Sequence, residues 1–283
     1  MRVASFIFKG QPIYGMIKDA GIYPVLSSFA SRFPSLRDVL EADAMADLSQ
    51  SCVNDPVELP DIVNLPPIPN PRKIICVGLN YKKPYPVPGE ELKSDNIVLF
   101  GRNVDTFVGH ERTLEIPRGL AGDSYDFEGE IAAVIGTHCR NIAADQALAH
   151  VAGYACMNEG SVRAWQKHSI YAGKNFVATG GWGPWLVTAD ESGSVSHMKL
   201  VTRVNGKEMQ SSTGAQMIHS LDNVISYISE IMPLDPGDVI ATGSPDGTGG
   251  SRSPNAYLVP GDQVEVEISG IGTLRNTVGL SRS

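Results

Sequence analysis

Short apolar segments bounded by Gly, Pro or Asp recur from residue 73 onwards and constrain the fold more than any other pattern in this chain of 283 residues. In the same part of the chain only residues 143–155 and 218–232 show a helical pattern. Many strands with few helices predict a β-rich α+β fold, a mixed sandwich, roll or barrel, in place of alternating strand–helix units. The predicted strands are KIICVGLN, NIVLFGR, FEGEIAAVIG, GPWLVTAD, HMKLVTRVNG, DVIATG and QVEVEIS.

The first 70 residues differ in character from the rest. Two alternating segments, residues 1–8 and 11–18, predict a hairpin, and Ser35 is placed to cap a helix that follows it. Six prolines between residues 56 and 71 exclude regular strand pairing and predict a semi-rigid linker. We therefore expect a small N-terminal α/β domain with its linker in residues 1–70 and a catalytic domain in residues 71–283.

Composition limits the partners and the compartment. The chain has 23 basic and 31 acidic side chains and a formal net charge of −8, which argues against nucleic acid as a partner. No apolar run approaches the ~18 residues that span a bilayer. The four cysteines lack zinc-site spacing and are expected to be reduced. These features predict a cytoplasmic protein that binds neither membrane nor nucleic acid.

Two glutamates, Glu128 and Glu130, stand at the start of an apolar strand. Residues i and i+2 of a strand point to the same face about 7 Å apart, so the two carboxylates repel unless a proton or a cation lies between them. Glu159, in the polar stretch 154–176, would complete a three-carboxylate site for a hard ion, Mg²⁺ or Mn²⁺ with Ca²⁺ as an alternative. The other interpretation is an exposed strand end with two solvated acids.

Six motifs follow one another along the chain: GLNY (78–81), DFEGEIAAVIG (126–136), GYxxxNEGSVR (153–163), GKNF (173–176), GPW (183–185) and ATGSPDGTG (241–249). In this order they resemble the motifs of the fumarylacetoacetate hydrolase family. The resemblance covers about residues 65–283 and implies a β-rich C-terminal domain, a small variable N-terminal domain and a homodimer. It also implies an Mg²⁺ or Mn²⁺ site that chelates the pyruvate-like end of a 2-keto or 2,4-diketo acid.

The resemblance assigns roles to individual residues. Glu128 and Glu130 match two glutamate ligands of the metal, and Glu159 stands where the family usually has Asp. Four further residues match positions at the substrate. Of these, Arg163 has an alternative role in pinning its loop, and Lys174 is a candidate acid or electrostatic clamp for a developing enolate. The four residues are Arg163, Gln166, Lys174 and Ser244.

The largest departure from the family follows GLNY. Many members carry a His–Glu pair there that activates water, but this chain has Pro84 near the expected His, and Glu90 and Glu91 could replace only the Glu. A general base must reach its proton within about 3 Å or through one water, which proline cannot do. His168 is the alternative base, or else it is a surface loop residue.

These observations predict a metal-dependent hydrolase that cleaves a C–C bond in a small 2,4-diketo, acylpyruvate-like acid. The missing His leaves a decarboxylase, isomerase or dehydratase of a 2-keto acid open. A family member that binds a ligand without turnover is the third alternative.

Overall fold

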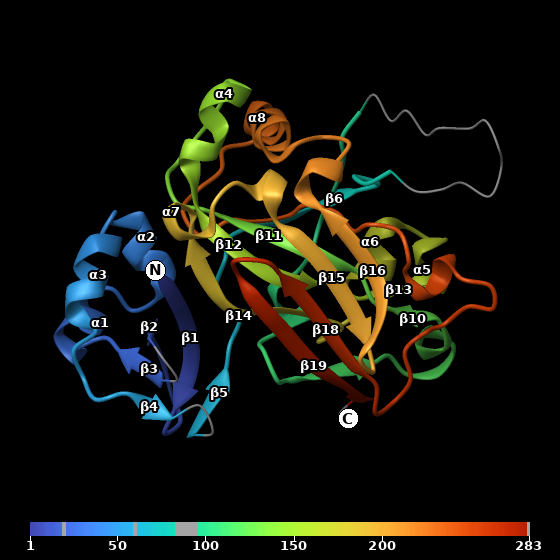
Figure 1. Ribbon diagram of the computed structural model, residues 1–283, viewed down its shortest axis with the longest axis horizontal. Coiled ribbons are helices and arrows are strands. Elements are labelled where there is room, and N and C mark those ends of the chain that lie inside the picture. The colour runs from blue at the N-terminus through green and yellow to red at the C-terminus, as the bar shows by residue number, and fades with distance from the viewer. Residues whose placement is uncertain (19–20, 59–60, 83–95, 282–283) are drawn as a thin grey trace.

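The computed structural model describes residues 1–18, 21–58, 61–82 and 96–281, and strands dominate its fold (Figure 1). Within these residues, twelve strands join one mixed sheet in the order β4-β3-β2-β1-β14-β12-β11-β17-β6-β7, with β5 paired to β1 and β8 to β14. The bounds are β1 Arg2–Phe8, β2 Gln11–Lys18, β3 Gly21–Pro24, β4 Val57–Glu58, β5 Ile62–Asn64, β6 Ile74–Gly78, β7 Val98–Gly101, β8 Phe107–Val108, β11 Gly129–Ile135, β12 Val151–Asn158, β14 Gly180–Thr188 and β17 Val239–Ala241.

A second sheet of five strands, in the order β16-β15-β18-β19-β9, packs against the first, and β10 and β13 form a separate pair. These strands are β9 Thr113–Ile116, β10 Tyr125–Asp126, β13 Ser161–Val162, β15 Lys199–Val204, β16 Lys207–Thr213, β18 Gln263–Ile268 and β19 Gly272–Leu280. The α-helices are α1 Ser27–Arg32, α2 Leu36–Glu41, α3 Met45–Ser51, α4 Ala144–Ala147, α5 Arg163–Gln166, α6 Ile170–Lys174, α7 Ala189–Ser192 and α8 Leu221–Ile231. Short 3₁₀ helices are η2 Val104–Thr106, η3 Gly119–Ser124, η4 Leu148–His150, η5 Val195–His197, η6 Gly214–Gln216 and η7 Gly249–Ser251.

Strand β11 lies at the centre of this sandwich and is buried on both faces. Its alternate residues, of which Ile131 is one, enter a core shared with the second sheet and α8. The residues between them, such as Ala132, enter a core shared with the N-terminal helices. Because a strand presents successive side chains to opposite faces, the continuous apolar run IAAVI fits this doubly covered position. The β-rich sandwich expected from the sequence is confirmed.

The predicted N-terminal hairpin and helix are also confirmed. Strands β1 and β2 pair in register up to Phe8 and Gln11, and the turn residues Lys9 and Gly10 both have positive φ, as a two-residue hairpin turn requires. Ser35 caps α2 through a capping box with Asp38.

Two expectations about local structure were wrong. The helix expected over residues 143–155 ends at Ala147, and residues from Val151 form β12, because pairing with β11 and β14 outweighs the helix propensity of its alanines. The proline-rich stretch does contain regular pairing, since β4 and β5 fit between prolines and pair with β3 and β1. Prolines flank these two short strands and lie outside them.

The N-terminal segment extends the central sheet, since β1 pairs with β14 at two positions and its helices share a core with the sheet. A domain boundary near residue 70 stays a prediction.

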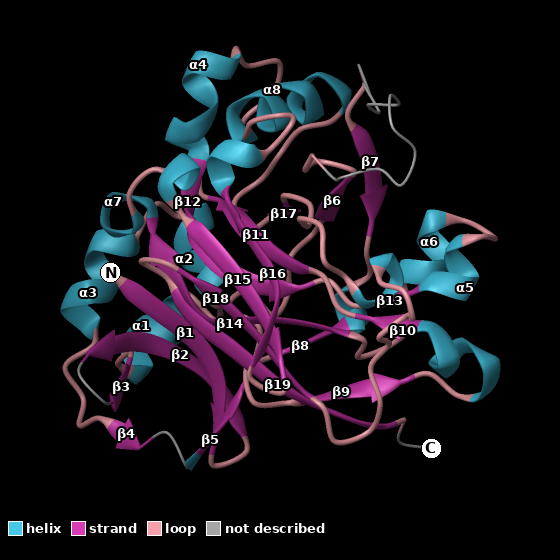
Figure 2. Ribbon diagram, turned by 45° about the vertical axis from the view of Figure 1, so that its right-hand side comes forward, coloured by secondary structure: helices cyan, strands magenta, loops and turns pink. Residues whose placement is uncertain are grey.

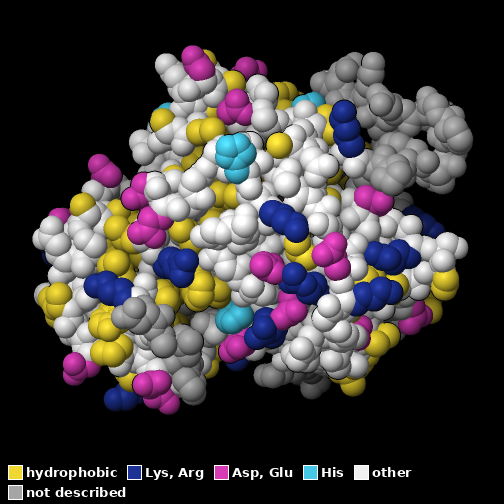
Figure 3. All heavy atoms as spheres, viewed as in Figure 1, with side chains coloured by type: hydrophobic (Ala, Val, Ile, Leu, Met, Phe, Trp, Pro, Cys, Tyr) yellow, Lys and Arg dark blue, Asp and Glu magenta, His cyan; other side chains and the backbone are white. Residues whose placement is uncertain are grey.

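None of the helices in the described part of the chain is long and apolar enough to cross a membrane. Figure 3 shows acidic and basic side chains interspersed on the face that carries the second sheet, where Arg203 pairs with Glu267 and Arg275 with Glu265.

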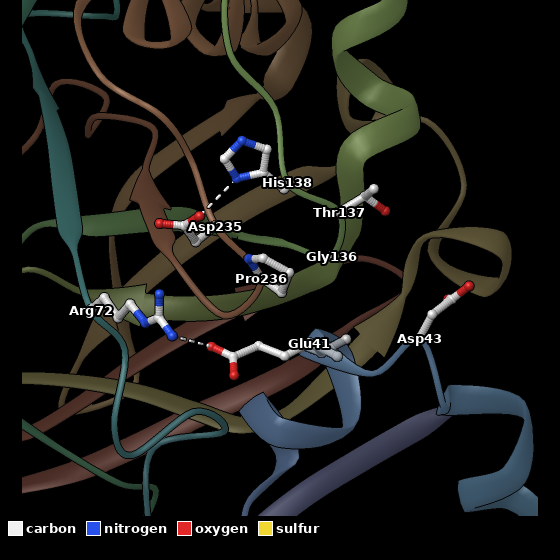
Figure 4. Close-up of a pocket in the computed structure, with 9 residues that line it drawn as sticks. Glu41, Asp43, Arg72, Gly136, Thr137, His138, Asp235 and Pro236 are labelled. Atoms are coloured by element: carbon white, nitrogen blue, oxygen red, sulfur yellow. Dashed lines mark hydrogen bonds and ion pairs between the residues drawn. The ribbon is translucent and has the colours of Figure 1, made fainter.

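A buried carboxylate joins the starts of β6 and β17. Asp238 is 0 % exposed and accepts hydrogen bonds from the backbone N–H groups of Lys73 (3.0 Å) and Asp235 (2.9 Å), while the Lys73 ammonium lies 2.7 Å away. Asp235 pairs in turn with Lys73 and with His138 at the edge of a cleft of about 410 Å³ (Figure 4). On the other side of this cleft, Arg72 pairs with Glu41 of α2.

Replacing Asp238 by Ala should lower the free energy of unfolding by about 3 kcal/mol, because two partly buried backbone donors and one ammonium lose their fully buried acceptor. Urea denaturation measures this change. Replacement of the exposed Asp123 by Ala is the control and should change stability by less than ~0.5 kcal/mol. An Asp238→Ala variant as stable as wild type would contradict the assigned role.

Asp235 should make stability depend on pH in the acid range. Hydrogen bonds from His138 and Lys73 lower the pKa of its carboxyl below the ordinary value. Its contribution is therefore complete above the unfolded pKa of about 3.9 and is lost as the pH falls through the folded pKa. We expect Asp235→Asn to be about 1 kcal/mol less stable than wild type at neutral pH, and the difference to vanish at the acid end of a series of urea titrations.

Candidate metal centre and active site

Three glutamates converge at one end of the central strands. Glu130 lies on β11, Glu128 immediately precedes that strand and Glu159 immediately follows β12, its antiparallel neighbour. All three are buried and line a cavity of about 260 Å³. Figure 2 shows β7 and the α5–α6 pair, which supply other walls of this cavity, on the same side of the molecule. Its other lining residues are Val77, Gly78, Leu79, Val98, Phe100, Arg163, Gln166, Ile170, Lys174 and Ser244.

Two cations balance part of this negative charge. The Lys174 ammonium, buried at the end of α6, pairs with both Glu128 and Glu159. Burial favours the neutral amine, but the two carboxylates outweigh this effect and raise the pKa of Lys174 above its ordinary value. Arg163 lies 2.7 Å from Asp126 and 3.0 Å from Glu128. Lys174 is therefore held as an ammonium.

Hydroxyl and amide groups fix the carboxylates further. Ser161 and Ser244 donate hydrogen bonds to the two oxygens of Glu128, at 2.5 and 3.3 Å. The backbone N–H of Gly243 donates to Glu130 at 2.9 Å. Burial raises the pKa of Glu130 well above its usual range, and the Glu159 carboxylate adds to this shift because two buried like charges oppose ionisation.

The donors present fit a hard divalent cation. Carboxylate oxygens are the ligands that Mg²⁺, Mn²⁺ and Ca²⁺ prefer, and one buried oxygen of Glu159, Oε1, has no hydrogen-bond partner. Over the described ranges, no three His, Cys, Asp or Glu side chains are arranged to enclose an ion as they stand. Instead, the Lys174 ammonium bridges Glu128 and Glu159. A cation there would require Lys174 to move.

The structure brings most of the predicted site residues together. Arg163, Gln166, Lys174 and Ser244 line the same cavity as the three glutamates. His168 is not brought there, because it is exposed and packs beside the Trp165 ring on the surface, which matches the alternative interpretation as a loop histidine. All six histidines of the chain lie in the described ranges, and none lines this cavity. Pro84, Glu90 and Glu91 lie outside the described residues.

Sequence reasoning gave no role to Asp126, although it stands in the quoted DFEGE motif. Asp126 is fully buried and accepts hydrogen bonds from the backbone N–H groups of Gly249 (2.7 Å) and Gly250 (2.9 Å) and from Arg163 Nε (2.7 Å). It thereby joins the C-terminal Gly-rich loop to the arginine. This arrangement supports a loop-pinning role for Arg163, whose NH1 also donates to Gln166.

Comparison with known proteins identifies the family. Residues 73–279 match the family described as fumarylacetoacetate (FAA) hydrolase, C-terminal. Over 227 residues, covering 77 % of this chain and 70 % of the relative, the chain is 35 % identical to the mitochondrial oxaloacetate tautomerase FAHD2A of Bos taurus. It is 36 % identical over 217 residues to the oxaloacetate tautomerase YisK of Bacillus subtilis, covering 75 % of this chain and 72 % of that protein.

Solved structures support the same family assignment. A fumarylacetoacetate hydrolase from Exiguobacterium antarcticum superposes with a TM-score of 0.86 at 31 % identity, over 99 % of this chain and 100 % of that one. A 5-carboxymethyl-2-hydroxymuconate delta-isomerase from Mycobacterium smegmatis superposes with a TM-score of 0.77 at 26 % identity, over 99 % and 100 % of the two chains. Tautomerases, an isomerase and a hydrolase are thus among the relatives. The chain belongs to the fumarylacetoacetate hydrolase family.

Proposed function

We propose that this protein is a metal-dependent enzyme that moves a proton between the keto and enol forms of a small 2-oxo acid, with oxaloacetate as the first substrate to test. The observation that carries the proposal is a cavity that combines three buried carboxylates with one buried ammonium and is lined by no histidine among the described residues. The two tautomerases that are about 35 % identical to this chain support the same reaction class.

The cation would be held by Glu128, Glu130 and Glu159, whose oxygens suit Mg²⁺ or Mn²⁺, with Ca²⁺ as an alternative. When bound, it would supply Lewis-acid polarisation of the 2-oxo group. The protein supplies the walls of the cavity and fixes the carboxylates through Ser161 and the Gly243 amide.

The remaining side chains suit the handling of an enolate. In keto–enol conversion the proton of the enol oxygen would pass to solvent and a proton from solvent would be added to the neighbouring carbon, so the step balances and no water is consumed. The Lys174 ammonium would donate a hydrogen bond to the oxygen on which charge develops. Gln166 accepts from Arg163 through its amide oxygen, which leaves its N–H donors for a substrate oxygen. Ser244 offers a further hydroxyl at the cavity wall.

Hydrolysis of a C–C bond in a 2,4-diketo acid, the reaction placed first on sequence grounds, is the second candidate. The likeness to the Exiguobacterium hydrolase favours it. It needs a group that activates water, and none of the six histidines reaches the described cavity wall. We therefore place proton transfer first. A homodimer and a cytoplasmic location stay predictions.

A substrate panel separates the two candidates. Purified protein with Mg²⁺ or Mn²⁺ should accelerate the loss of the ultraviolet absorbance of enol-oxaloacetate, and EDTA should reduce the rate at least ~100-fold. Release of pyruvate and CO₂ detects decarboxylation, and release of a second carboxylic acid from an acylpyruvate detects hydrolysis. Faster acylpyruvate cleavage than tautomerisation would make hydrolysis the principal activity and contradict the preference for proton transfer. No turnover of any 2-oxo acid would leave ligand binding as the function.

Lys174→Met should lower kcat by about 100- to 1,000-fold, because the developing enolate loses its buried donor. Lys167→Met is the matched control, since Lys167 is exposed and does not line the cavity. Steady-state kinetics at saturating Mn²⁺ measures both variants. If Lys174→Met retained the wild-type kcat, the assigned role of Lys174 would be wrong.

A further inference from the structure

Arg102, immediately after β7, is a buried cation that the proposed chemistry leaves without a role. Its side chain stacks on the Phe107 ring at 4.2 Å from the centroid. Its three nitrogens donate at 3.2 Å to Thr106 Oγ1, to the carbonyl oxygen of Gly160 and to Thr179 Oγ1. All three acceptors are neutral, and in the described portion of the chain no carboxylate forms an ion pair with Arg102. Burying a charge without an opposite charge beside it costs free energy, so we expect this guanidinium to have a structural role.

The carbonyl that Arg102 binds belongs to the residue directly after Glu159. Gly160 has a φ of +40°, and a Cβ on it would lie 1.8 Å from the Thr179 carbonyl oxygen, so the turn is tight and requires glycine. On the other side, the backbone N–H of Glu159 donates to the Glu128 carbonyl oxygen at 2.8 Å. The backbone that carries Glu159 is therefore held at both ends, and Arg102 supplies one of the two anchors.

We propose that Arg102 is a positioning residue that fixes the Glu159–Gly160 turn and thereby sets the affinity of the site for a divalent cation. This inference rests on the proposed metal site. Its guanidinium acts through Gly160 and makes no direct contact with the cavity, whose lining does not include Arg102. Because groups that orient a metal ligand change affinity about 10- to 100-fold, the effect is large enough to measure by titration.

The test is Mn²⁺ binding to the full chain by isothermal titration calorimetry. Arg102→Met should raise the Kd for Mn²⁺ at least ~10-fold, because the turn loses its anchor. Arg102→Lys keeps the charge but not the three-way donor geometry, so its Kd should lie between those of wild type and Arg102→Met. Catalytic rate should fall in both variants at limiting Mn²⁺ and recover at saturating Mn²⁺, which damage to the fold as a whole would not allow.

Asp238→Ala is the control for lost stability. Asp238 binds residues at the start of β6, whereas the cavity is lined by the other end of that strand. This variant should melt earlier than wild type but keep the wild-type Kd for Mn²⁺. Thermal melting of every variant shows that the protein titrated is folded, and if Arg102→Met does not fold, Arg102→Lys alone decides.

Two results would overturn the inference in different ways. If wild type binds Mn²⁺ and the folded Arg102 variants bind it equally well, Arg102 has no positioning role and the proposed function stands. If wild type itself binds no Mn²⁺, the proposed metal site fails, and this inference fails with it. A rise in Kd that Asp238→Ala reproduces would also count against Arg102.

Discussion

The burial of four carboxylates in one region is the constraint on which the rest of the site depends. Asp126, Glu128, Glu130 and Glu159 are all nearly or fully buried, and like charges removed from water repel strongly. The fold offsets this repulsion with hydrogen-bond donors that are fixed in the protein and take the place of water. Asp126 is satisfied by three backbone amides and an arginine, whereas Glu130 receives one backbone amide and carries a raised pKa. The carboxylates are therefore not equivalent, and Glu128, Glu130 and Glu159 line the cavity whereas Asp126 does not.

The architecture explains why such a site is held rigidly. Glu128 and Glu130 flank the first residue of β11, a central strand buried on both faces, and Glu159 directly follows its neighbour β12. Pairing of Gly129 with Asn158 sets the register between the two strands, and the Asn158 side chain also accepts from the backbone N–H of Glu128. Sites built on such strands are held more precisely than sites on loops. The relative positions of the three glutamates thus follow from sheet register.

The strands and the cluster of carboxylates could be predicted from the sequence, because the signals for them are local. Alternation, turn residues and the run IAAVI are local signals, so the hairpin, α2 and β11 were predictable. Strand β12 was not, because its small residues favour helix until β11 and β14 cover both of its edges. The contact of Arg102 was not predictable either. Nothing near it in the sequence indicates Gly160, which lies 58 residues away, and only the folded chain brings the two residues together.

Charge balance would link the proposed cation to the proposed substrate. Four carboxylates against the cations Arg102, Arg163 and Lys174 leave one net negative charge when all are ionised. A divalent cation alone would turn this into one net positive charge, which a buried cavity disfavours as much as the negative one. A cation together with the carboxylate of a 2-oxo acid restores neutrality. Binding of metal and of acid should therefore each favour the other.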